Sequence, residues 1–468
     1  MLSSRLPKDL TPSPFFAELE RAKAQVLAEC ADAGENGTEC LPFIDMTVSS
    51  PLRVGLPFDM ASAVDEAKAE FGTWVADAAG RREAREAVAE YYRERGGAFT
   101  PGQIILTAST SEAYSVLFKT FCDPGDVILT PMPGYPLLDT LAQLEHLECA
   151  PYFLKLKRET VKAKVVTNKV GHDRAESPMK NVILSGAKNP VTSSFRFVLD
   201  TDSLLAAPER AKILLLVSPH NPTGHCVSRE EWNEAVRFCE ENNMILVVDE
   251  VFADYAFSDK VQRSWKYLKE LGDGAQNSGN NADTCNLKPE TSDLFDAGGG
   301  DFINLPENGP KCPIFWLNGL SKAVGSPQLK LGWMAFYAPR EKFEEIRAAL
   351  EFVEDAYLSV SAPAQALARP MLAASAVYES RIRERLLQNW NMLREAFPSK
   401  YCPEVLGGWY AVLRLGEDDE EITLRLLREK HVLVQPGFFF DFDEDGWIVI
   451  SLLQDPVQFK QAIERIKE

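Results

Sequence analysis

The sequence lacks several features that would point to a particular class of protein. No stretch reaches the roughly 18 apolar residues that a membrane-spanning helix needs, and the opening residues MLSSRLPKDL contain no apolar signal core. Positive charge is scarce, because 50 Lys and Arg face 69 Asp and Glu, which gives a formal net charge of −19. A surface of this sign repels phosphates. We therefore expect a cytoplasmic protein that binds neither a membrane nor nucleic acid.

Metal-binding patterns are missing as well. The nine cysteines are scattered without a CxxC pair, and the five histidines show no paired spacing. Zinc sites and disulfide frameworks usually show such clusters in the sequence. We expect reduced thiols, no structural zinc and no other metal site.

The chain does contain enough apolar residues for a large packed protein. Its 468 residues exceed the size at which one hydrophobic core stops growing. From about residue 61 to 245, segments with helical periodicity alternate with short apolar runs. The periodic segments predict helices at 80–97 and 111–121, and the apolar runs predict buried strands at 103–108, 126–131, 212–219 and 244–250. This alternation predicts an α/β fold with a large, doubly wound, mainly parallel sheet.

The remaining segments suggest how the chain is divided into domains. Residues 1–57 are predicted to form an N-terminal arm that joins a small domain, 58–338 a large domain, and 339–468 a smaller α+β domain. Two polar segments, at about 157–194 and 259–311, interrupt the large domain. Because Gly-, Asn- and Ser-rich chain buries little apolar surface, we expect inserted surface loops over most of both.

Three polar residues follow predicted strands or sit in a glycine-rich turn. Asn221 lies in the turn SPHNPTGH, Asp249 ends the run MILVVD, and Lys322 lies in LNGLSKAVGSPQLKLGW. Ligand sites in open parallel sheets lie beyond the carboxyl ends of the strands, so these residues are candidates for a site. A carboxylate there needs a cationic partner, and a desolvated lysine has a free amine that forms imines. The ordinary alternatives are a tight turn, a helix cap or ion pair, and a solvated surface charge.

Taken together, the motifs resemble the fold-type-I, class I/II aminotransferases, and more loosely their alanine-aminotransferase-type members. The similarity covers nearly the whole chain, in the family's order: DMTVSSPLRVGLP, AREAVAEYY, ILTASTSEA, PMPGYP, SPHNPTG, VVDEVF, LSKAVGSPQLKLGW and VLVQPGFFF. The resemblance implies the aspartate aminotransferase fold, pyridoxal 5′-phosphate (PLP) as cofactor, and a homodimer.

The resemblance also implies a role for each candidate residue. Lys322 would hold the cofactor as a Schiff base and move the proton to and from the substrate. Asp249 would keep the pyridine nitrogen protonated, Asn221 would bind the ring oxygen, and Tyr135 would stack on the ring. The phosphate would be bound by Ser109, Thr110 and Ser111, at a helix start that favours anions, with Lys330 as its countercharge.

Four positions depart from the family pattern. Lys330 stands where an arginine is usual, Gly319 where many members have a serine, and Phe252 where a tyrosine is common. The arginine that usually clamps the substrate carboxylate is replaced by Val449. Arg53 and Arg414 are the candidates to replace it.

These observations lead to one main functional hypothesis and two alternatives. We expect a PLP-dependent aminotransferase that moves an amino group between a small L-amino acid and a 2-oxo acid. One alternative is a PLP-dependent lyase, either a C–S lyase or an enzyme similar to aminocyclopropane-carboxylate synthase. The other is a PLP-fold regulator without turnover, although a basic DNA-binding segment is not evident.

Overall fold

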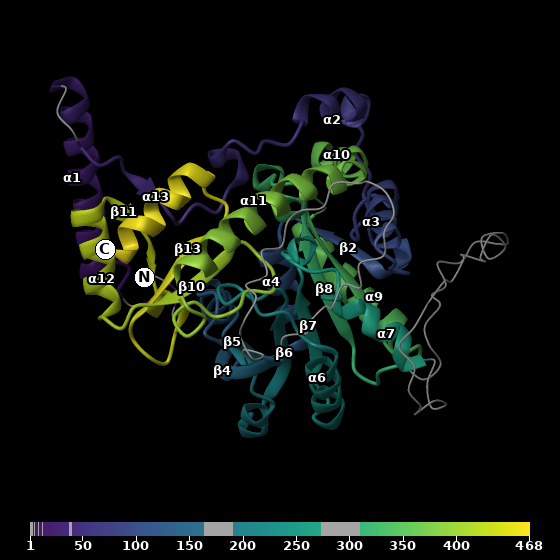
Figure 1. Ribbon diagram of the computed structural model, residues 1–468. Coiled ribbons are helices and arrows are strands. Elements are labelled where there is room, and N and C mark those ends of the chain that lie inside the picture. The colour runs from purple at the N-terminus through teal and green to yellow at the C-terminus, as the bar shows by residue number, and fades with distance from the viewer. Residues whose placement is uncertain are drawn as a thin grey trace, which may run out of the picture.

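The computed structural model describes the chain except residues 1–2, 4, 8, 12, 37–39, 163–190, 273–308 and 359. Figure 1 shows a large lobe built on one sheet and a smaller lobe that contains the C-terminus. None of the described helices is both long and apolar enough to cross a membrane.

An eight-stranded mixed sheet forms the centre of the large lobe. Its strand order is β2-β9-β8-β7-β6-β3-β4-β5, and the pairs from β8 through β4 are parallel. The edges are antiparallel, since β2 and β8 both run opposite to β9, and β5 runs opposite to β4. The strands are β2 (Ile104–Thr107), β3 (Val127–Met132), β4 (Glu148–Lys162), β5 (Val191–Leu199), β6 (Ala211–Val217), β7 (Ile245–Asp249), β8 (Ile314–Gly319) and β9 (Gly332–Tyr337). The predicted α/β class and the four predicted buried strands are confirmed.

Helices cover both faces of this sheet, because its central strands are apolar on both sides. Ile213, Leu215 and Val247 face α4 (Thr110–Phe121), α5 (Leu137–Leu144) and α9 (Phe343–Tyr357). Leu214 and Leu216 point the other way, toward α3 (Arg82–Glu94), α6 (Arg229–Glu241) and α7 (Ser264–Gly272). The two predicted helices correspond to α3 and α4.

The smaller lobe packs its helices on a three-stranded antiparallel sheet of order β10-β13-β12. Its elements are β10 (Tyr410–Arg414), β12 (Gln435–Pro436), β13 (Trp447–Ser451), α11 (Ser375–Ala396), α12 (Asp419–Lys430) and α13 (Pro456–Lys467). The N-terminal segment joins this lobe: α1 (Pro14–Asn36) packs on α12, and β1 (Ile44–Asp45) pairs in parallel with β11 (Val432–Leu433). α2 (Met60–Ala67) packs on α10 (Ala362–Ala373), and the short helix α8 (Leu320–Ala323) directly follows β8.

Packing departs from two of the predicted boundaries. Residues 339–373 were assigned to the small domain, yet Phe343, Ile346 and Leu350 of α9 lie in the core of the large sheet, and α10 packs on α3. Both predicted inserted loops have ordered ends, because β4 and β5 pair through Lys162 and Val191 and α7 begins at Ser264. Trp265 anchors α7 in the apolar core, a long-range contact that local composition does not reveal. Residues 163–190 and 273–308 lie outside the described chain.

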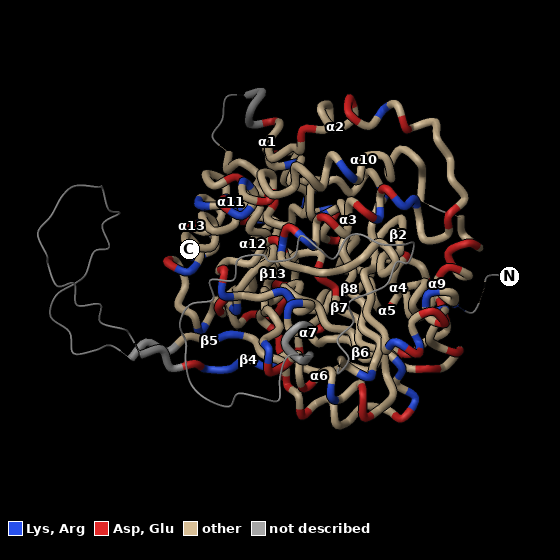
Figure 2. Tube along the Cα trace, turned by 90° about the vertical axis from the view of Figure 1, so that its right-hand side faces the viewer, with Lys and Arg blue, Asp and Glu red and all other residues tan. Residues whose placement is uncertain are grey.

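Charged residues are distributed over the outer helices and loops, with Asp and Glu interspersed among Lys and Arg (Figure 2). Several pair locally at helix spacing, such as Arg82 with Glu86 and Arg347 with Glu351. Such exposed pairs contribute at most about 1 kcal/mol each. These ion pairs therefore contribute little to the stability of the fold compared with the apolar core.

Candidate active site

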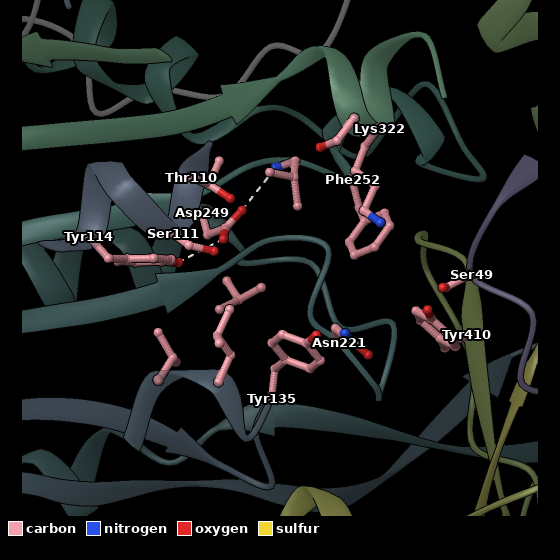
Figure 3. Close-up of a pocket in the computed structure, with 15 residues that line it drawn as sticks. Ser49, Thr110, Ser111, Tyr114, Tyr135, Asn221, Asp249, Phe252, Lys322 and Tyr410 are labelled. Atoms are coloured by element: carbon pink, nitrogen blue, oxygen red, sulfur yellow. Dashed lines mark hydrogen bonds between the residues drawn. The ribbon is translucent and has the colours of Figure 1, made fainter. Parts of the chain in front are cut away.

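A cavity of about 230 Å³ lies at the carboxyl ends of the central strands, between the two lobes (Figure 3). The large sheet contributes the ends of β6 and β7 and the turn after β8, while Ser49 and Tyr410 come from the smaller lobe. The lining residues are Ser49, Thr110, Ser111, Tyr114, Tyr135, Leu137, Leu138, Val217, Asn221, Asp249, Val251, Phe252, Ser321, Lys322 and Tyr410. Six of the eight residues expected to contact the cofactor are thus brought together.

Asp249 is held in place at the end of β7 by two hydrogen bonds. The Tyr114 hydroxyl donates to Oδ2 at 2.7 Å, and the Val251 backbone N–H donates to Oδ1 at 3.0 Å. Burial raises the pKa of the Asp249 carboxyl, whereas these hydrogen bonds and the charge of Lys322 lower it. The carboxylate therefore has a fixed orientation toward the cavity, and its burial favours a cationic ligand.

Lys322 lies in α8, one turn beyond the end of β8. Its Nζ is 4.9 Å from the centroid of the Trp409 ring and 5.5 Å from that of Phe252. Its backbone carbonyl accepts a hydrogen bond from the Tyr255 hydroxyl at 2.6 Å. Burial lowers the pKa of the Lys322 amine to about 8, although the negative charge of Asp249 opposes this shift. A substantial fraction of this amine is therefore neutral near pH 8, the form that attacks an aldehyde.

Asn221 projects into the cavity from the turn after β6. Within this turn the Gly224 N–H donates to the His220 carbonyl at 2.8 Å, and the His220 ring contacts Thr223 Oγ1 at 2.9 Å. His220 is buried, and it is not part of the cavity lining. The Asn221 Oδ1 atom is buried without a hydrogen-bond partner in the described part of the chain. An unpaired buried carboxamide is costly, so this side chain fits a polar ligand in the cavity.

The start of α4 forms the opposite wall. Ser109 is the N-cap, since its hydroxyl accepts from the Glu112 N–H at 3.2 Å, and Thr110 and Ser111 line the cavity with Ser321. The Ser109 side chain therefore caps α4, and Ser109 is not among the residues that line the cavity. The first backbone N–H groups of a helix lack partners within the helix, and this arrangement suits an anionic group.

Two glycines allow β8 and β9 to approach this helix start. A Cβ atom on Gly332 would lie 3.0 Å from the Ser109 carbonyl carbon, and one on Gly319 would lie 3.0 Å from both Gly332 Cα and the Leu331 carbonyl oxygen. Gly319 and Gly332 are also paired in register across β8 and β9. A serine at position 319 would therefore require the backbone of Leu331 and Gly332 to give way by a few tenths of an ångström, so the present strand spacing favours glycine there.

Three basic residues singled out in the sequence are not among the residues that line the cavity. Lys330 is exposed in a left-handed conformation, with φ of 53°, at the end of a short 3₁₀ turn. Arg53 is exposed on another 3₁₀ turn. Arg414 pairs with Glu444 and lies over the Trp447 ring, 5.6 Å from its centroid. Among the described residues, the cavity lining thus has one cationic side chain, Lys322.

The structure also reveals lining residues that the sequence did not single out. Tyr114 and Tyr410 contribute hydroxyl groups, and Ser49 approaches from the segment after β1. Only Tyr114 had a local signal, because it lies in the helix predicted at 111–121. Tyr410 and Ser49 reach the site through the pairing of distant strands, which a single sequence does not encode visibly.

Val449 lies on the face of the small sheet that is turned toward the cavity. It pairs in register with Val412, and Tyr410 lies two residues before Val412 on the same strand. Residues two apart on a strand share a face. A longer side chain at position 449 would therefore extend from the side of the sheet that carries Tyr410, but Val449 itself is completely buried.

The fold and these groups define a class: α/β proteins with a buried lysine amine beside a fixed carboxylate at the mouth of a parallel sheet. Residues 61–466 match the family model described as aminotransferase class I and II. The chain belongs to this family.

The relatives are distant. The chain is 23% identical to the glutamate-pyruvate aminotransferase AlaA of Haemophilus influenzae, over 83% of this chain and 81% of that protein. It is 20% identical to the tyrosine aminotransferase of Caenorhabditis elegans, over 84% and 69%. It is also 20% identical to the S-alkyl-thiohydroximate lyase of Arabidopsis thaliana, over 87% and 74%.

Solved structures agree on the fold. An aspartate aminotransferase double mutant of Thermus thermophilus aligns with a TM-score of 0.68 at 20% identity, covering 100% of this chain and 99% of the other. The alanine aminotransferase of Pyrococcus furiosus aligns with a TM-score of 0.66 at 20% identity, covering 98% of both. The predicted aspartate aminotransferase fold is thereby confirmed.

Proposed function

We propose that the protein is a PLP-dependent aminotransferase that moves an amino group between a small L-amino acid and a 2-oxo acid, with Lys322 as the amine to which the cofactor attaches. The observation that carries the proposal is the convergence of Lys322, Asp249 and Asn221 on one cavity. Membership of the aminotransferase family supports a PLP-dependent enzyme.

The residues of the cavity fit the parts of PLP one by one. Asp249 would face the pyridine nitrogen, Asn221 the ring oxygen, and the helix start at Thr110 and Ser111 the phosphate. Tyr135 lies at the mouth, half exposed, where its ring would cover one face of the pyridine. When bound, PLP supplies an electron sink that stabilises the negative charge left when the substrate loses its α-proton.

Lys322 would perform two tasks with the same amine. Its lowered pKa provides the neutral form for attachment, and the released amine would then hold and return the substrate's α-proton. The aromatic rings of Trp409 and Phe252 exclude water on one side of Nζ. Asp249 would keep its negative charge because a cationic partner offsets its burial.

The substrate side of the cavity has neutral donors. Burial raises the pKa of Tyr410, so its hydroxyl keeps its proton at neutral pH and can donate. The Ser49 hydroxyl lies beside it and lines the same wall. We propose that these two hydroxyls bind the substrate carboxylate in place of the arginine that Val449 replaces.

A lyase is the second candidate. It is favoured by the lack of an arginine among the described residues that line the cavity. A carboxylate bound by hydroxyls alone is held less firmly than one in a bidentate arginine fork. Product analysis separates the two functions. A keto acid that forms only in the presence of a 2-oxo acid acceptor indicates transfer, whereas ammonia released without an acceptor indicates elimination.

The attachment site is tested by borohydride reduction of the PLP-loaded protein, followed by peptide mapping. We expect the label on the peptide that contains Lys322 and no label in K322A. A label on another lysine, or none in the wild-type protein, would refute the proposal. Screening amino acids for a change in cofactor absorbance then identifies the substrate.

We also propose a homodimer, because the family resemblance implies a site shared between subunits. Light scattering of the purified protein measures its mass directly. A mass of one chain at micromolar concentration would contradict this part of the proposal.

A further inference from the structure

A second group of reactive side chains lies in the smaller lobe, away from the cavity. Cys30, near the end of α1, Cys40, in the segment that leads to β1, and His431, which caps α12, meet at one point. Cys30 Sγ lies 3.7 Å from Cys40 Sγ and 3.6 Å from His431 Nδ1, and Cys40 Sγ lies 3.8 Å from the same nitrogen. We call this group the Cys₂His cluster.

These three distances match the edges of a tetrahedral zinc site. With Zn–S bonds of about 2.3 Å and Zn–N bonds of about 2.0–2.1 Å, tetrahedral angles place two sulfurs about 3.8 Å apart and a sulfur and a nitrogen about 3.6 Å apart. A disulfide would need the two sulfurs at about 2.05 Å and would leave the imidazole without a role. The nearly equal distances of the nitrogen from both sulfurs therefore favour three ligands around one ion.

The Leu41 carbonyl oxygen lies near a fourth vertex, 3.3 Å from Cys30 Sγ and 3.5 Å from Cys40 Sγ. Its distance to His431 Nδ1 is 2.7 Å, which is the length of a hydrogen bond. Nδ1 therefore carries the proton in the metal-free protein and donates it to Leu41. An ion would replace that proton, and the fourth position would be filled by this carbonyl or by water.

The second ring nitrogen of His431, Nε2, also has a neighbour that suits metal binding at Nδ1. When Nδ1 binds a metal, Nε2 carries the proton, and Glu29 Oε2 lies 3.9 Å from Nε2. A carboxylate in this position orients a histidine ligand and increases its basicity. A small movement of the half-exposed Glu29 side chain would bring it into hydrogen-bond distance.

The backbone around the cluster holds the ligands in place. The His431 N–H donates to Leu426, its carbonyl accepts from Ile44 at 2.9 Å, and Arg465 donates to the Pro42 carbonyl at 2.8 Å. Such fixed ligands lose little conformational entropy on binding. Figure 1 shows why the position matters: α1 lies along α12 at the outer edge of the smaller lobe. An ion here would bind α1 and the segment before β1 to the end of α12.

We propose that Cys30, Cys40 and His431 form a structural site for a soft divalent metal ion, with Zn²⁺ as the expected ion. Two thiolates and one imidazole favour zinc over the oxygen-seeking ions Mg²⁺ and Ca²⁺. The sequence predicted no metal site, because the ligands are separated by 10 and 401 positions and meet only through tertiary contacts. This site is independent of the PLP proposal.

The first test measures metal binding by the full-length, reduced protein after treatment with a chelator. Co²⁺ is the probe, because tetrahedral Co²⁺ bound to thiolates has characteristic visible bands and a sulfur-to-metal charge-transfer band. We expect one ion per chain, displaced by Zn²⁺. C30S, C40S and H431N should lose these bands, and H431N keeps a residue that tolerates the left-handed backbone at φ of 55°. C122S, which removes a partly buried cysteine elsewhere in the chain, should bind Co²⁺ like the wild type.

The second test does not require the ligand variants to fold. E29Q should weaken Zn²⁺ binding by about 10-fold or more, and Zn²⁺ should protect two thiols of the wild-type protein from a thiol reagent. Added Zn²⁺ should also raise the Tm of the wild type and of C122S, because it binds the folded state. Absence of charge-transfer bands, binding unchanged in C30S, or a Cys30–Cys40 disulfide whose reduced form binds no metal would each overturn the proposal.

Discussion

The two halves of the cavity differ in how their polar groups are supported. On the side of the large sheet, two hydrogen bonds fix the Asp249 carboxylate, and the Lys322 amine lies near the Trp409 and Phe252 rings. On the side of the smaller lobe the lining residues Ser49 and Tyr410 are neutral, and Val449, which is fully buried, does not line the cavity. The comparison teaches that the groups proposed for the reactive chemistry lie at the ends of the central strands, whereas the groups proposed to bind the substrate come from chain segments that are distant in sequence.

The largest effect is expected from Lys322. K322A removes both the attachment amine and the proton carrier, so kcat should fall by at least roughly 10²–10⁴-fold. K322R is the matched control, because it keeps a positive charge without a usable amine. Single-turnover kinetics measure the loss. Activity of K322R close to that of the wild type would show that the amine is not required.

Asp249 should rank second. D249N would leave the ring nitrogen without its proposed counterion, and the loss of one partner of a buried ion pair costs about 3–5 kcal/mol, or roughly 10²–10⁴-fold in kcat. Y114F is the matched comparison, since it removes one hydrogen bond to the same carboxylate and should cost about tenfold or less. If Y114F were as severe as D249N, the charge of Asp249 would not be the important property.

The titration of Lys322 sharpens the comparison further. In the cofactor-free protein its amine has a pKa of about 8, so it should react with an acylating reagent with a midpoint near that pH, whereas surface lysines react with a midpoint of about 10.4. Because Asp249 raises this pKa, D249N should move the midpoint lower. In the unfolded chain the Lys322 amine has its ordinary pKa of about 10.5 and binds its proton more tightly than in the folded protein. Lys322 should therefore lower the free energy of unfolding as pH falls from about 10.5 to about 8. Labelling followed by mass spectrometry gives the midpoint, and a midpoint near 10.4 would contradict the buried position.

The substrate side should give smaller effects, and they should appear in KM. Y410F removes one donor to the substrate carboxylate and should raise KM by about tenfold with little change in kcat. R414A is the control, because Arg414 pairs with Glu444 and not with the cavity. Steady-state kinetics with the amino acid of highest kcat/KM compare the KM and kcat of the two variants. A larger effect in R414A than in Y410F would return Arg414 to the list of carboxylate ligands.

The smallest expected change concerns Phe252, which lines the cavity where many family members have a tyrosine. F252Y adds a donor to the anionic ring oxygen, and hydrogen bonds to a charged form favour that form. The pH titration of the bound cofactor's absorbance should therefore shift to lower pH by about one unit or less. F252L serves as the control and should cause no downward shift. An unchanged titration in F252Y would remove Phe252 from the ring oxygen.

The sequence predicted the large sheet well and the substrate side poorly, for a physical reason. Buried strands such as 244–250 can be predicted from their local composition. Because ligand sites of parallel sheets lie beyond the carboxyl ends of the strands, Asp249 and Asn221 are then expected at one edge of the sheet. No local pattern indicates that Tyr410 reaches the same cavity, because its position depends on the pairing of β10 with β13 and on how the lobes pack. The Cys₂His cluster was not predicted for the same reason. His431 and Cys30 are brought together by tertiary contacts, namely the packing of α1 on α12 and the pairing of β1 with β11.

The paired glycines beside the helix start have a consequence for how this sequence can change over time. A single G319S exchange would place a carbon 3.0 Å from Gly332 Cα and 3.0 Å from the Leu331 carbonyl oxygen, so the backbone there would have to give way by a few tenths of an ångström. Changes elsewhere that move β8 and β9 slightly apart would make a serine easier to accept. The effect of a substitution at position 319 thus depends on which neighbouring mutations arise before it.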